Sequence, residues 1–260
     1  MNYIDTHSHF NLSQFDGDHE EAIMRMNDAQ VGTICIGIDH ATSVIACELA
    51  ETHDTIWACI GIHPTEWEQT FDLAVFSTLA ERTRVVAVGE CGLDYFREKE
   101  RAAKSEQRNL FEAQIHFARI HDLPLMLHIR SSEGTMDAYK DALALLTTYK
   151  TQWPTMRGTA HFFAGTKEIA DRFLALGFHI SFSGVITFVP EYENVVRHIP
   201  LERILSETDA PFAAPAPYRG KRNEPSYVGE IVKKIAEIKQ LPLETVEVQL
   251  LDNARKLFRI

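Results

Sequence analysis

The stretch YIDTHSHF, residues 3–10, is a short apolar segment that ends in two histidines one residue apart. Side chains at positions i and i+2 of a β-strand project from the same face of the sheet. If this stretch is a strand, His7 and His9 therefore point toward one place near its carboxyl end. The same pattern, an apolar run with a chemically active side chain at its end, recurs along the chain.

Seven further segments of this kind follow, and polar stretches with helical spacing separate them. They are GTICIGID (32–39), IWACIGIHP (56–64), RVVAVGECGLD (84–94), LPLMLHIR (123–130), GTAHFFAG (158–165), FHISFSG (178–184) and RILSETDAP (203–211). A strand–helix unit that occurs eight times predicts an α/β fold, the closed (β/α)8 TIM barrel. An open doubly wound sheet is the alternative, but the sequence has no G-x-G-x-x-G motif. No linker divides the chain, so we expect a single domain over residues 1–260.

The composition limits the partners that the protein can have. Its 260 residues include 26 Lys and Arg against 37 Asp and Glu, a formal net charge of −11. This charge argues against a broad nucleic-acid groove, although cations held in a site can reverse the local sign for a phosphate substrate. The four cysteines form no C-x-x-C pair, and no apolar run has membrane-spanning length. We therefore expect a cytoplasmic monomer without a membrane partner.

Polar side chains stand at or near the downstream ends of the apolar segments, and in a barrel these ends form one ring. The candidate metal ligands are His7, His9, Glu90, His128, His161 and Asp209. Imidazole and carboxylate together favour Zn²⁺, Mn²⁺, Fe²⁺ or Ni²⁺. Six ligands are too many for one tetrahedral ion but suit two ions that share a carboxylate, typically ~3.5–4 Å apart.

Several motifs together resemble one known family. They are DTHSHF, GIHP, AVGECGLDY, LPLMLHIR, ETDAPF, RGKRNEP and NARKLF, which extend over almost the whole chain. This set resembles the TatD-type metal-dependent hydrolases, or TatD DNases, of the amidohydrolase superfamily. The resemblance implies that His7, His9 and Asp209 bind one metal ion, that His128 and His161 bind a second, and that Glu90 bridges them. It also implies a 3′–5′ DNA exonuclease or related phosphodiesterase with two divalent ions, Mg²⁺, Mn²⁺ or Zn²⁺.

Hydrolysis agrees with the chemistry of these residues. A metal ion lowers the pKa of bound water, and Asp209 can both bind an ion and accept a proton from the attacking water. We expect His63 to bind the substrate phosphate or relay a proton, although it could simply brace the turn at Pro64. Phosphate contacts are expected from Arg130 and from Arg222 and Asn223 in the basic segment after ETDAP, for which a solvated loop is the ordinary alternative.

One segment departs from the family pattern. The family usually has H-C-F-S-G at the sixth strand, whereas this chain has His161-Phe162-Phe163-Ala164-Gly165. The ligand remains, but apolar groups replace a thiol and a hydroxyl beside it. The change therefore bears on substrate preference rather than on metal binding.

Three functions follow from the sequence. The first is a two-metal phosphodiesterase that acts on single-stranded ends of DNA or RNA. The second keeps the metal site but takes a small phosphoester, ester or amide. The third is a catalytically idle scaffold or binding protein, which the retention of all six ligands disfavours.

Overall fold

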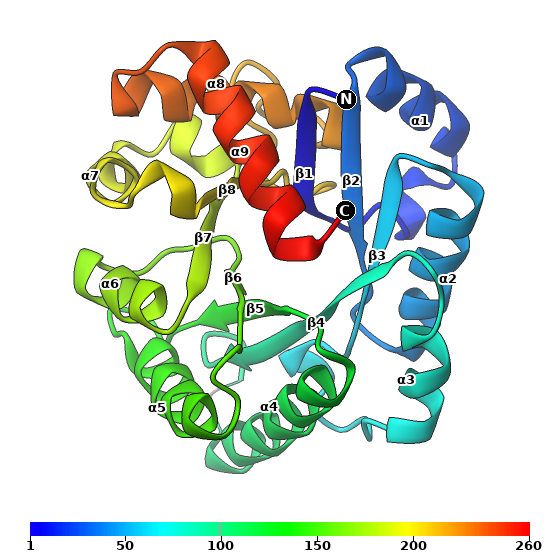
Figure 1. Cartoon of the computed structure of the whole chain (residues 1–260), viewed down its shortest axis with the longest axis vertical. Coiled ribbons are helices and arrows are strands. Elements are labelled where there is room, and N and C mark those ends of the chain that lie inside the picture. Colours follow the sequence, from blue (N-terminus) through cyan, green and yellow to red (C-terminus); the bar gives the residue numbers. More distant parts are fainter. Residues whose placement is uncertain (99) are drawn as a thin grey trace.

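The computed structural model describes residues 1–98 and 100–260, and these form an eight-stranded parallel sheet surrounded by helices (Figure 1). The strands are β1 (Tyr3–Ser8), β2 (Val31–Ile36), β3 (Ile56–Ile60), β4 (Val85–Asp94), β5 (Leu125–Arg130), β6 (Gly158–Ala160), β7 (Phe178–Phe182) and β8 (Ile204–Ser206). They are ordered in the sheet as they are in the sequence. Each of the eight predicted segments coincides with one of these strands, although β2 begins one residue before its segment, at Val31.

The first and last strands meet just beyond their carboxyl ends. Ser8 and Ala210 form an isolated parallel bridge. The backbone nitrogen of His9 donates to the carbonyl of Ala210 at 2.7 Å, and that of Asp209 donates to the carbonyl of His7 at 2.9 Å. The predicted (β/α)8 barrel is therefore confirmed, and two of the candidate ligand segments form part of its closing seam.

The helices lie on the outside of the barrel and alternate with the strands (Figure 1). They are α1 (His19–Asp28), α2 (His40–Thr52), α3 (Leu73–Ala80), α4 (Arg101–His121), α5 (Asp137–Gln152), α6 (Lys167–Ala175), α7 (Glu193–His198), α8 (Val228–Lys239) and α9 (Leu243–Phe258). Single 3₁₀ turns are η1 (Ser13–Phe15), η2 (Pro64–Glu66), η3 (Gly184–Thr187), η4 (Pro190–Tyr192), η5 (Leu201–Arg203) and η6 (Pro225–Tyr227). Among the described helices, none is both long and apolar enough to cross a membrane.

Local sequence determines where several helices begin. Asp39 accepts a hydrogen bond from the backbone nitrogen of Thr42, whose hydroxyl in turn accepts one from the backbone of Asp39, so a capping box starts α2. Asp72 and Thr166 cap α3 and α6 with their side-chain oxygens. Each cap ends a loop from the carboxyl end of a strand, and these loops form the mouth of the barrel.

The opposite end of the barrel is covered by α9, which the repeat of strands and helices does not predict. Ala254, Leu257 and Phe258 of α9 pack in one apolar cluster with Ile4 and Met126, which lie early in their strands. Figure 1 shows α9 lying across the barrel. The amino-terminal end of the barrel is thus closed by apolar packing, so the carboxyl end is the one open to a substrate.

Candidate metal centre

Glu90 lies at the centre of the site because the backbone of β4 bends around it. Gly89 and Gly92 have φ angles of +151° and +142°, a conformation that residues with a side chain rarely adopt. A Cβ on Gly92 would lie 2.0 Å from the carbonyl oxygen of His128. The pairing of β4 with β5 shifts register between Val88 and Cys91. The glycines therefore let β4 approach β5 closely while the buried Glu90 carboxylate points into the barrel.

One oxygen of Glu90 belongs to a four-membered group with His7, His9 and Asp209. The Nε2 atoms of the two histidines are 3.3 Å apart. Each nitrogen lies 3.4–3.6 Å from Oε2 of Glu90 and from Oδ1 of Asp209. Four ligands held about 2.1 Å from a tetrahedral ion are about 3.4 Å from one another. The distances from each histidine to the other three atoms therefore match the spacing of ligands around a single ion.

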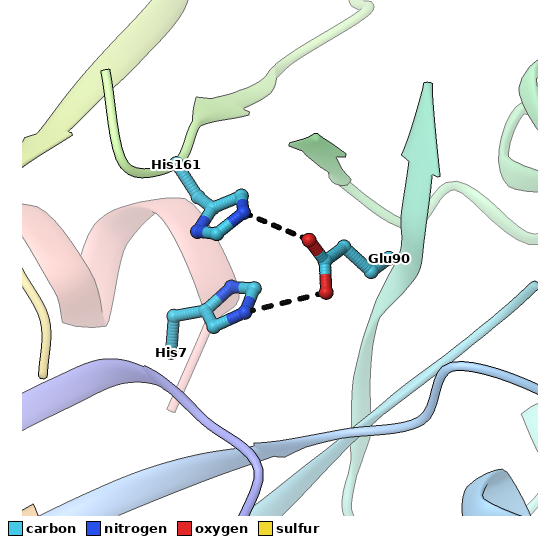
Figure 2. Close-up of side chains that lie close together, drawn as sticks. All are labelled: His7, Glu90 and His161. Atoms are coloured by element: carbon cyan, nitrogen blue, oxygen red, sulfur yellow. Dashed lines mark ion pairs between the residues drawn. The ribbon is translucent and has the colours of Figure 1, made fainter. Parts of the chain in front are cut away.

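The other oxygen of Glu90 faces the histidines of β5 and of the segment after β6. Oε1 lies 2.6 Å from Nδ1 of His128 and 2.8 Å from Nε2 of His161. Figure 2 shows His7 and His161 directed at different oxygens of the same carboxylate. Glu90 and the five other residues that the sequence predicts as ligands thus lie together. His7 and His9 lie near one oxygen of Glu90, His128 and His161 lie near the other, and Asp209 lies beside His7 and His9.

The histidines of the second group are held by carboxylates behind them. Asp94 lies 3.1 Å from Nε2 of His128, and Glu207 lies 3.3 Å from Nδ1 of His161. A carboxylate on the far nitrogen fixes the tautomer and orientation of a ligating imidazole. The sequence does not predict the contact of Asp94 with His128. It misses Glu207, although a glutamate next to an apolar strand and two residues before Asp209 is a usable signal.

The electrostatics of the site favour positive charge between the carboxylates. Burial alone raises the pKa of Glu90, but the surrounding imidazoles, led by His161, outweigh it and hold that pKa well below its usual range. Burial opposes protonation of His161, yet Glu90 and Glu207 raise its pKa well above the usual value. Burial, reinforced by His161, lowers the pKa of His7 to about 4, so His7 is neutral at pH 7. Neutral imidazole is the form that binds a metal ion.

His63 serves the site through both of its ring nitrogens. Its Nδ1 accepts a hydrogen bond from the backbone nitrogen of Thr65 at 3.1 Å, which braces the η2 turn. The neutral ring must then carry its proton on Nε2, which lies 3.7 Å from Oε1 of Glu90. Burial, followed by the charge of His128, keeps the pKa of His63 well below its usual value. The residue therefore presents a fixed N–H donor at the centre and also holds its turn.

A cavity of about 760 Å³ opens over the two groups at the mouth of the barrel, within the size range of small-ligand sites. Its lining includes His9, His63, Glu90, His128, His161 and Asp209, together with Arg97, Arg130, Tyr139, Phe162, Tyr192 and Phe212. Arg130 lies over the ring of Phe96 at 4.0 Å and has no carboxylate partner among the described residues. Of the three expected phosphate contacts, Arg130 is the one that lines this cavity.

Two of the expected substrate contacts lie elsewhere, and their prediction needs correction. Arg222 is outside the cavity lining, and its guanidinium binds Asp18 at 2.5 Å and Glu224 at 3.0 Å. Asn223 is fully buried, and its amide donates to the backbone carbonyls of Thr208 and Phe212. Both residues therefore fix the loop after β8 and do not face a substrate.

A TIM barrel with imidazoles and carboxylates gathered at its carboxyl end is an architecture of metal-dependent hydrolases. The family model described as TatD related DNase matches residues 4–259. The chain therefore belongs to the TatD family of metal-dependent hydrolases.

Relatives and solved structures match over nearly the whole chain. The uncharacterized metal-dependent hydrolase YabD of Bacillus subtilis is 39% identical over 262 residues, which cover 99% of each protein. The 3′-5′ ssDNA/RNA exonuclease TatD of Pectobacterium carotovorum is 32% identical over 259 residues, covering 95% of this chain and 96% of that protein. The crystal structure of YjjV, a TatD homologue from Escherichia coli, superimposes with a TM-score of 0.89 at 30% identity, covering 100% of this chain and 98% of that one.

Proposed function

We propose that this protein is a two-metal phosphodiesterase that removes nucleotides from the 3′ ends of single-stranded DNA or RNA. The observation that carries the proposal is that the two carboxylate oxygens of Glu90 face different sets of residues. Its Oε2 atom lies with His7, His9 and Asp209, whereas its Oε1 atom lies with His128 and His161. A carboxylate shared in this way is the bridge that a pair of ions requires.

The residues fit two divalent ions. In this proposal, His7, His9, Asp209 and Glu90 would hold the first ion, and Glu90 with His128 and His161 would hold the second. The mixed nitrogen and oxygen donors suit Zn²⁺ or Mn²⁺, and the carboxylates also admit Mg²⁺. Bound ions of this kind acidify water and offset the negative charge that develops on a phosphoryl group.

The protein's own groups supply proton transfer and orientation. Asp209 directs Oδ1 at the histidines, and its side chain is 14% exposed, so its second oxygen is available to accept the proton of an attacking water from the cavity. The Nε2–H of His63 can donate to a phosphoryl oxygen without a change of charge. Arg130 at the rim of the cavity offers a guanidinium to the next phosphate along the strand.

The Pectobacterium relative supports nucleic-acid ends as the substrate, because its name describes a 3′-5′ exonuclease on single-stranded DNA and RNA. The net charge of −11 also fits a protein that takes a strand end into a cationic centre better than one that wraps a duplex. A small phosphoester, ester or amide is the second candidate, and the bounded volume of the cavity favours it.

The test uses end-labelled single-stranded DNA and RNA, incubated with Mg²⁺, Mn²⁺ or Zn²⁺ and compared with small aryl phosphodiesters. We expect stepwise shortening from the 3′ end in the wild type, and loss of hydrolysis in Glu90→Gln and Asp209→Asn. Asp72→Asn is the matched control, because this carboxylate caps α3 away from the site. Wild-type rates in either site variant, or cleavage of the small diesters alone, would contradict the proposal.

A further inference from the structure

Backbone strain in this protein is concentrated at the cavity. Seven non-glycine residues have a positive φ angle among the described residues. Four of them, Gln30, Asp122, Gln240 and Arg259, follow helix ends, where this conformation is common. The other three, Phe162, Asp209 and Ala213, all line the cavity. Strained residues that persist in a site usually have their side chains placed for a function.

Phe162 is the least expected of the three, because a bulky side chain at positive φ is rare. Its φ is +42°, and its backbone nitrogen donates to Oε1 of Glu207 at 2.6 Å. The same carboxylate supports His161. The ring of Phe162 lies with its centroid 6.2 Å from that of His161 and remains partly exposed in the cavity. Glu207 therefore orients a candidate metal ligand and an aromatic ring together.

Phe212 provides a second aromatic surface from the loop after β8. It follows β8, and its ring is 6.0 Å from that of His9. The side chain is 47% exposed and lines the same cavity. Two phenyl rings are thus exposed to water directly beside the most polar part of the molecule. Apolar surface in that position is expected where a ligand covers it.

A ligand that fills this cavity must carry an anionic group for the metal centre and, next to it, a flat group with apolar faces. We propose that Phe162 and Phe212 form a base-stacking surface for the 3′-terminal nucleotide whose phosphodiester is cut, an inference that rests on the proposed function. Aromatic rings next to cationic groups are the usual means of holding unpaired bases, and every base has a face that can stack. Arg130 supplies the cation at the rim of the same cavity.

Two properties of the substrate follow. A 3′-terminal base in a duplex is held by its partner and by the neighbouring base, so it must be unpaired and unstacked before it reaches this surface, and unpaired ends are therefore favoured. Stacking does not read the hydrogen-bonding edges of the base, so the four bases are taken with little preference. Phe162, which stands where the family pattern has cysteine, makes this surface a property of the present chain.

The experiment compares two 5′-labelled single strands that differ only at the 3′ end, one with a terminal thymidine and one with a base-free tetrahydrofuran nucleotide. The readout is the ratio of kcat/KM for removal of that first residue. We expect the wild type to favour the base-bearing strand by about 5- to 150-fold, the range for one stacking contact. Phe162→Leu and Phe212→Leu should each lower this ratio through KM, whereas Phe162→Tyr, which keeps a ring, should retain it.

Phe188→Leu is the matched control, because this phenylalanine is exposed to a similar extent, 36%, but lies outside the cavity lining. Its ratio should equal that of the wild type. Equal hydrolysis of the two strands by the wild type would overturn the stacking surface and leave the proposed function standing. Failure to shorten either strand with any of the three ions would instead overturn the proposed function itself.

Discussion

The carboxylate of Asp5 accepts two hydrogen bonds from Thr208, one from its backbone nitrogen at 2.7 Å and one from its hydroxyl at 2.6 Å. Asp5 lies in β1 two residues before His7, and Thr208 directly precedes Asp209 beyond the end of β8. The pair therefore joins the first and last strands of the barrel at the point where two candidate ligands are positioned relative to each other. The seam of the fold and the geometry of the metal centre depend on the same contact.

Replacing Asp5 by Asn should weaken metal binding without unfolding the protein. The side-chain NH2 group of Asn cannot accept a hydrogen bond from Thr208. The spacing between His7 and Asp209 is then no longer fixed by this contact. Loss of such a supporting partner typically lowers metal affinity about 10- to 100-fold. Titration calorimetry with Zn²⁺ or Mn²⁺ measures the effect, with Asp72→Asn as the control for the same chemical change at a helix cap. Unchanged affinity in Asp5→Asn would mean that the seam does not position the ligands.

The fold could be predicted from the sequence because its signal is repeated and local. Each strand is an apolar run, and each is followed by a helix-like stretch, so eight weak observations support one topology. The exception is α9, whose apolar residues Leu257 and Phe258 pack on the barrel interior. Its partners include strands more than 100 residues earlier in the chain, for example β5 through Met126. Such a contact leaves no trace in the spacing of the strands.

The site was predictable to the extent that its residues stand at the ends of strands. The six candidate ligands do so, and the barrel brings them together. Arg222 failed as a prediction because a basic loop looks like a phosphate site, whereas its actual partner, Asp18, lies 204 residues away. The sequence marks Phe162 only as a departure from the family pattern. Its role in the cavity depends on a backbone conformation that the sequence does not reveal.

Removal and return of divalent ions should change the stability of the protein. The centre brings the buried carboxylate of Glu90 and the partly exposed one of Asp209 together with several imidazoles, and an ion that binds only the folded state stabilises it by about 2.7 kcal/mol at a hundred times its Kd. For a chain of this length, that corresponds to a rise in Tm of about 5–10 °C over the chelator-treated protein. Glu90→Gln should lose most of this rise. A Tm that no divalent ion changes would contradict the metal centre, since the readout does not depend on activity.

Stability should fall at mildly acidic pH because of His179, which lies in β7 away from the metal centre. Burial, followed by the charge of Arg203, lowers the pKa of His179 from its ordinary value of 6.5 to about 4. Between these two values the unfolded chain binds more protons than the folded one, so the free energy of unfolding falls as the pH falls, and below pH 4 this contribution changes no further.

Comparison of the wild type with His179→Gln isolates this effect from other titrating groups. From pH 7 to pH 5 the wild type should lose about 2 kcal/mol more than the variant, as measured by urea unfolding at each pH. An equal loss in the two proteins would show that His179 does not carry the acid sensitivity.

Arg130 and Arg222 should respond differently to the same substitution, because only one of them lines the cavity. Arg130→Gln removes a guanidinium that, in the proposed function, contacts a substrate phosphate, so KM for a single-stranded oligonucleotide should rise about tenfold, and the dependence of KM on salt should become weaker. Arg222→Gln breaks the contacts to Asp18 and Glu224. It should lower the free energy of unfolding by about 1 kcal/mol and leave KM within about twofold of the wild type.

Steady-state kinetics at low and high salt, with urea unfolding of both variants, separates the two roles. A larger increase in KM for Arg222→Gln than for Arg130→Gln would show that the strand passes over the loop after β8 and not over the end of β5.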